Sequence, residues 1–184
     1  MSLGFVDTVI TSIYIGGDSP TGWYFWDGEA KQENPISKTA IKCYIKKINV
    51  KETEYKGKRQ DKLILTIEAD KLYNIKSGIE TWFSKTLLIR LTQMDIEQLS
   101  HPVIIHVKKG NEGEPIVFST IQDASGEYIK RPTDFDYKQY KNINLLKEHY
   151  YRVQSVIESA VSRQLSEQSI PTPPVWDEDS DIDF

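Results

Sequence analysis

The sequence has little cysteine and histidine and no long apolar run. Of its 184 residues one is cysteine, Cys43, and three are histidine. A single cysteine excludes an internal disulfide and a cysteine-rich zinc site, so packing must stabilise the fold. No apolar run approaches the roughly 20 residues of a membrane-spanning helix, and the chain does not start with a basic stretch followed by a long apolar one. We therefore expect a cytoplasmic protein that does not bind a membrane.

The sequence also lacks the motifs that mark common enzymes. It contains no Gly-x-x-x-x-Gly-Lys-Ser/Thr loop, no Gly-x-Gly-x-x-Gly, no Gly-x-Ser-x-Gly elbow and no His-Glu-x-x-His. The spacing of His101, His106 and His149 gives no set of metal ligands. Cys43 falls at an expected core position, where a lone cysteine is most often an inert small hydrophobe. We expect no enzyme activity, no catalytic residue, no cofactor and no metal.

Charge is segregated along the chain, although the formal net charge is only -4. Residues 38–90 hold 13 bases and 6 acids, a net charge of +7. Residues 177–184 hold five acids and no base, and without them the remainder would carry 23 - 22 = +1. This asymmetry indicates a basic binding surface with an acidic tail. The alternative is a solvated charged face beside a disordered terminus.

Alternation of apolar and polar residues predicts strands in the centre of the chain. It runs through residues 39–51, where the adjacent Lys46 and Lys47 shift its phase, as a β-bulge in a long coiled strand would. A helix capped by Ser84 is expected after the third strand, with a strand through residues 86–91 as the alternative. The other expected strands cover residues 63–69, 75–83, 103–108 and 116–121.

This order of elements predicts a mainly β fold. It is typical of a five-stranded Greek-key barrel of the oligonucleotide/oligosaccharide-binding (OB) type, with a short helix between strands three and four. A β-sandwich or a mixed α+β sheet would give a similar number of strands. We divide the chain into an N-terminal aromatic arm or cap (1–38), an OB-like nucleic-acid-binding barrel (39–131), a C-terminal helix (132–165), and a flexible linker with a disordered acidic tail (166–184).

The C-terminal helix has one apolar stripe from Ile143 to Ala160, with apolar residues three and four positions apart. Docking of this stripe on the barrel is the use that we favour, because three heptads are short for a coiled coil. A homo-oligomer seam is the alternative.

Bases and aromatic residues interleave over the expected central strands and their loops. Phosphates require cations, and unpaired bases stack on aromatic rings for roughly 1–3 kcal/mol each, so a single-stranded nucleic acid needs both residue types. In the alternative interpretation, Tyr44 and Trp82 are ordinary cross-strand partners and the lysines are solubilising charges. The predicted nucleic-acid-binding residues are Lys42, Tyr44, Lys46, Tyr55, Lys56, Lys58, Arg59, Lys62, Tyr73, Lys76, Trp82 and Lys85.

Four consecutive aromatic residues, Trp23 to Trp26, form a cluster near the N-terminus. Large aromatic residues usually belong to a core or cover one, so we favour a cap over the barrel. A second platform for base stacking is the alternative.

The C-terminus is acidic, follows a proline-bearing linker, and ends at Phe184 with the carboxylate of the chain. Ile182 and Phe184 can fill an apolar pocket while the acids steer the peptide to a basic rim. This segment resembles the acidic tip of bacterial and phage single-stranded-DNA-binding proteins, in which acids precede an isoleucine, a proline and a terminal phenylalanine. Asp183 stands where that family usually has proline. The resemblance implies a divergent or phage-type member whose tip recruits replication, recombination or repair proteins through Asp179, Asp181, Ile182, Asp183 and Phe184.

We therefore predict a non-catalytic, sequence-tolerant protein that binds single-stranded DNA, in the nucleoid or in phage-infected cytoplasm. A protein-interaction adaptor without nucleic-acid binding is one alternative. An RNA-binding protein of the same fold is another, because a stacking platform accepts both nucleic acids and only a contact to the 2′-hydroxyl separates them.

Overall fold

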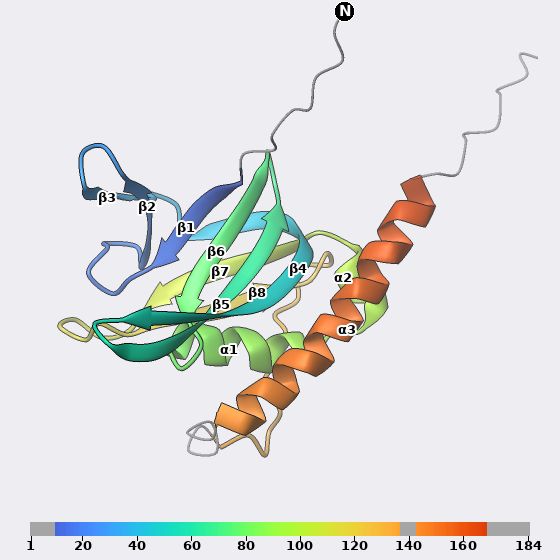
Figure 1. Cartoon of the computed structure of the whole chain (residues 1–184). Coiled ribbons are helices and arrows are strands. Elements are labelled where there is room, and N and C mark those ends of the chain that lie inside the picture. Colours follow the sequence, from blue (N-terminus) through green and yellow to red (C-terminus); the bar gives the residue numbers. More distant parts are fainter. Residues whose placement is uncertain (1–9, 137–142, 169–184) are drawn as a thin grey trace, which may run out of the picture.

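The computed structural model describes residues 10–136 and 143–168 (Figure 1). Its helices are α1 (Trp82–Leu91), α2 (Ile96–Ser100) and α3 (Ile143–Gln168). Its strands are β1 (Thr11–Ile15), β2 (Trp23–Asp27), β3 (Gln32–Pro35), β4 (Ala40–Tyr55), β5 (Lys58–Glu68), β6 (Leu72–Gly78), β7 (Val103–Lys109) and β8 (Val117–Gln122). These strands form one curled, mixed sheet of eight, in the order β3-β2-β1-β6-β5-β4-β7-β8.

The mainly β class and the C-terminal helix are confirmed, but the five-stranded barrel that we expected is wrong. Strands β4 to β8 lie close to the predicted positions. The region 1–38, which we expected to be an arm or cap, supplies three more strands of the same sheet. Because β1 pairs in parallel with β6, the edge of β6 that would close a five-stranded barrel is already occupied.

The long strand β4 makes the sheet curl. Ala40–Cys43 pair with β7, whereas Tyr44–Tyr55 pair with β5. The register shifts between Ile45 and Lys47, which confirms the predicted bulge. The two ends of β4 therefore belong to two parts of the sheet that face different directions, as Figure 1 shows.

The hydrophobic core lies on one face of the sheet. In β5 the residues Leu63, Leu65 and Ile67 are buried and alternate with more exposed ones, as the strand period requires. Helix α1 packs against β8, where the hydroxyls of Thr86 and Ser119 are 3.0 Å apart and hydrogen-bonded. Among the described residues, no helix covers the opposite face of β4, β5 and β6 (Figure 1).

Helix α3 docks on the body of the protein, in agreement with the use predicted for its apolar stripe. It contacts β4, α1 and α2, and its buried residues include Leu146, Val153 and Ile157. Near its end the buried Gln164 donates its side-chain amide to the Leu99 carbonyl, 3.1 Å away.

The start of α1 differs from the expectation. Strand β6 ends at Gly78 instead of continuing to residue 83, and Thr81 caps the helix by accepting a hydrogen bond from the Ser84 backbone N–H at 3.3 Å. Ser84 itself is buried inside the first turn. The β-branched and aromatic residues around Trp82 resemble a strand, but Gly78 and Thr81 form the turn that ends it.

Burial of Cys43 predicts a loss of stability at alkaline pH. Burial raises the pKa of this thiol to about 12 from its ordinary value of 9.0. Above pH ~9 the unfolded chain therefore loses a proton that the folded chain keeps, so the free energy of unfolding falls by about 1.4 kcal/mol per pH unit. Urea unfolding between pH ~8 and ~10 should show this fall in the wild-type chain. Cys43→Ala, which has no thiol, should show a smaller fall in the free energy of unfolding. Equal slopes against pH in the two chains would contradict the raised pKa of Cys43.

Candidate nucleic-acid interface

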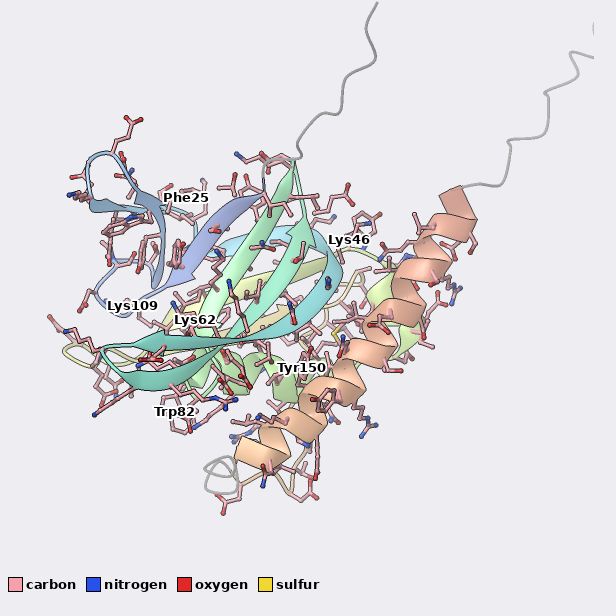
Figure 2. All side chains as sticks on the ribbon, in the orientation of Figure 1. Phe25, Lys46, Lys62, Trp82, Lys109 and Tyr150 are labelled. Atoms are coloured by element: carbon pink, nitrogen blue, oxygen red, sulfur yellow. The ribbon has the colours of Figure 1, made fainter. Side chains whose placement is uncertain are left out.

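Four lysines lie on the outward face of β4, β5 and β6, on the side opposite the core. Strand register places Lys51 directly across from Lys62. Lys47 lies on the same face of β4, four residues before Lys51, and Lys76 pairs with Ile64, two residues after Lys62. Residues facing each other across antiparallel strands point to the same side of a sheet. We call Lys47, Lys51, Lys62 and Lys76 the lysine face; Figure 2 labels Lys62.

The charges of the lysine face are not balanced by nearby carboxylates. Across residues 10–136 and 143–168, no ion pair includes Lys47, Lys51 or Lys62. Like charges directly opposite each other on neighbouring strands repel and destabilise the sheet. The pair of Lys51 and Lys62 therefore creates a site that a bound anion would stabilise.

Aromatic rings extend this face across β1 and β2. The Tyr14 and Tyr24 rings, paired across the two strands, are stacked with centroids 5.7 Å apart at an angle of 21°. The Lys76 ammonium lies 5.5 Å from the centroid of the Tyr14 ring, which joins the two sets of side chains. Trp26, on the same side of β2 as Tyr24, is 50% exposed. We call Tyr14, Tyr24 and Trp26 the aromatic platform.

The hydroxyl of Tyr24 stays protonated near neutral pH. Its pKa is raised above the ordinary value of 10.0, first by burial and then by the charge of Glu33 and a hydrogen bond to it. The Tyr24 ring is therefore uncharged, which suits contact with a flat, uncharged base.

The cluster from Trp23 to Trp26 divides between two roles. Trp23 is 1% exposed and donates its indole N–H to the Lys38 carbonyl at 2.6 Å, and Phe25 lies 6.4 Å from the buried Tyr73 ring. These two pack against the core, whereas Tyr24 and Trp26 face outward. Successive residues of a strand point to opposite faces, so Trp23 and Phe25 pack inward as expected of a cap, while Tyr24 and Trp26 leave their rings on the outward face.

Of the predicted residues in the first half of β4, Lys46 lies at the junction with α3. Lys46 forms an ion pair with Glu68 at 2.8 Å and donates a hydrogen bond to the side-chain oxygen of Gln164 at 3.0 Å. Its ammonium also lies 5.5 Å from the centroid of the Tyr44 ring. Lys46 therefore holds α3 to the sheet, while Lys42 is exposed beside β7.

The hairpin between β4 and β5 carries four more of the predicted residues. Lys56 and Lys58 are exposed, and Tyr55 pairs with Lys58 through the backbone. Arg59 is bound to Glu52 and, through its Nε at 3.2 Å, to Asp61. The hydrogen bond and charge of Asp61 raise the pKa of Arg59, so this guanidinium is already partnered within the protein.

The last three predicted residues also lie away from the lysine face. Tyr73 is in phase with the buried residues of β6 and is 8% exposed, so it does not face outward as we expected. Its hydroxyl donates to Asp70 at 2.9 Å. Trp82 and Lys85 belong to α1, where the Lys85 ammonium lies 5.7 Å from the Trp82 ring centroid.

The tail residues Asp179, Asp181, Ile182, Asp183 and Phe184 lie outside the described residues. Within the described ranges, no group of three or more histidine, cysteine, aspartate or glutamate residues could hold a metal ion. No described helix is long and apolar enough to cross a membrane. Comparison with known proteins gives no match to a protein-family model, a curated protein or a solved structure.

Proposed function

We propose that this protein binds single-stranded DNA, without strong sequence preference, through the lysine face and the aromatic platform. The lysines contact phosphates and the outward rings stack on bases, both of which are common to every nucleotide. Duplex DNA would leave the platform without a partner, because its bases are already stacked on each other.

One observation carries the proposal. Lys51 and Lys62 oppose each other across two strands without a carboxylate partner among the described residues, on the face that also holds the stacked rings of Tyr14 and Tyr24. A surface that only had to be soluble would gain stability from a carboxylate in place of one lysine.

The layout of the sheet supports the same function. A long bulged strand, β4, is shared between β5 and β7, and α1 and α2 join β6 to β7, at the position where an OB-type barrel has its helix. OB proteins bind oligonucleotides on the face of their second and third strands, which correspond to β5 and β6 here. Lys62 and Lys76 lie on these strands.

The acidic C-terminus adds a second part to the proposal. Its resemblance to the tips of single-stranded-DNA-binding proteins favours DNA over RNA. It also suggests that Ile182 and Phe184 recruit replication, recombination or repair proteins, with the acids steering the encounter.

Tryptophan fluorescence tests the binding step. The full chain and a chain ending at Val175, which lacks Trp176, are titrated with a single-stranded oligonucleotide at two salt concentrations. We expect salt-sensitive quenching in both chains, because phosphate contacts release counterions. Most of the quenching should come from Trp26, since Trp23 is buried and Trp82 is half-buried.

A duplex of the same sequence is the matched control and should compete weakly. No fluorescence change, together with no mobility shift of the oligonucleotide, would contradict the proposal. If the oligonucleotide does not bind but the tail captures proteins, the result would instead support the protein-interaction adaptor.

A further inference from the structure

A second basic surface lies on the outward face of β7 and β8. Two clefts of about 450 Å³ and about 350 Å³ adjoin there and share Thr120 and Tyr128. None of the residues lining the two clefts is acidic. The cationic residues that line them are Arg90, Lys108, Lys109, Lys130 and Arg131.

These cations come from three separate segments of the chain. Arg90 belongs to α1, Lys108 and Lys109 end β7, and Lys130 follows β8. Among the described residues, no ion pair includes Lys108, Lys109 or Lys130. The fold therefore gathers positive charge here from segments that are distant in sequence, and this surface has the electrostatic requirement for binding a chain of phosphates.

Tyr128 stands between the two clefts and is held in place by its neighbours. Its ring centroid is 5.6 Å from that of His106, yet 57% of the residue is exposed. His106 is fixed by a 2.8 Å hydrogen bond to the side-chain oxygen of Gln122, whose amide donates to the Gly126 carbonyl at 3.1 Å. A ring that is already oriented loses little freedom when a base stacks on it.

We propose that the surface around Tyr128 binds a second segment of single-stranded nucleic acid, with a base on Tyr128 and phosphates on Lys108, Lys109 and Lys130. The inference rests on the proposed function, because it extends the path of the same strand. Lys42 lies between the two surfaces: it is exposed on β4, the strand of the lysine face, and pairs with Ile104 of β7. A strand long enough to leave the lysine face would meet Lys42 before it reaches Tyr128.

The test uses the intact chain and two triple variants, with oligothymidylates of about 10 nucleotides, within the usual range of site sizes, and about 40 nucleotides, well above it. One variant is Lys108→Ala/Lys109→Ala/Lys130→Ala; the other is Lys47→Ala/Lys51→Ala/Lys62→Ala. We expect the first variant to bind the short probe as the wild type does. For the long probe, its slope of log affinity against log salt should be smaller by about 2, since each lost phosphate contact removes about 0.7.

Two variants of Tyr128 separate stacking from charge. Tyr128→Ala should weaken binding of the long probe by about 5- to 150-fold, the equivalent of one lost stack, whereas Tyr128→Phe should bind almost as the wild type does. Circular dichroism of both variants checks that the fold is intact. Wild-type values for Tyr128→Ala would overturn the inference.

The remaining outcomes separate the two proposals. If the β7 and β8 triple variant binds both probes as the wild type does while the lysine-face variant loses both, the inference is wrong and the proposed function stands. If the intact chain binds neither probe, both are wrong. A further outcome is that Tyr128→Ala loses binding of thymidine monophosphate but binds the long probe as the wild type does. That result would identify a free-nucleotide site and would also overturn the inference.

Discussion

Replacing Lys51 and Lys62 together by alanine should weaken binding of single-stranded DNA by roughly 25-fold at ~0.1 M salt. Each lysine that contacts a phosphate contributes about 0.7 to the slope of log affinity against log salt, so the double variant should lose about 1.4 of that slope. The same change removes a repulsive cross-strand pair, and the free energy of unfolding should stay equal or rise by up to about 1 kcal/mol. A fluorescence titration over several salt concentrations and a urea unfolding curve measure the two effects.

A matched control removes the same charge elsewhere. Lys71 and Arg152 are exposed, the first in the turn before β6 and the second on α3. Lys71→Ala/Arg152→Ala should change affinity and salt slope far less than the variant of the lysine face. Equal losses in the two double variants would mean that net charge, and not the lysine face, determines binding.

Replacing Trp26 by alanine should weaken binding by about 5- to 150-fold, because one stacked base loses its platform. Trp26 is 50% exposed, so little stability should be lost. Trp26→Phe keeps a flat ring and should retain most of the affinity while removing most of the fluorescence response. Binding of both variants is measured by fluorescence anisotropy of a labelled oligonucleotide, which does not depend on the protein signal.

Trp82→Phe is the control for this change, since Trp82 lies at the start of α1 and its ring is 5.9 Å from that of Phe118. It should bind DNA with almost wild-type affinity. Full affinity in Trp26→Ala would exclude Trp26 from the binding surface.

Local patterns predicted those parts of the fold that depend on neighbouring residues. The bulge at Lys46 follows from two adjacent lysines in an alternating strand, and the apolar stripe of α3 follows from residues one turn apart. The parallel pairing of Thr11–Ile15 with β6 joins segments that are far apart in sequence. No local pattern indicates which free strand edge a short strand will pair with, so the N-terminal strands were expected as a cap.

The candidate site could be predicted only where alternation along a single strand was sufficient. Lys62 and Lys76 were expected from simple alternation, but Lys47 and Lys51 were missed because their outward direction depends on the phase after the bulge. Tyr14 was missed because only pairing of β1 with β6 brings it beside Lys76. Alternation within β2 was a usable signal, since it places Tyr24 and Trp26 together on one face.

Protection of individual lysines by bound DNA tests the proposed interface most directly. The intact chain is treated with an amine-reactive reagent, with and without a single-stranded oligonucleotide, and each lysine is read by mass spectrometry. We expect Lys47, Lys51 and Lys62 to lose most of their reactivity in the complex, while the exposed Lys71 stays reactive. Unchanged reactivity of those three lysines in a saturated complex would show that the DNA binds elsewhere, and would contradict the assignment of the lysine face.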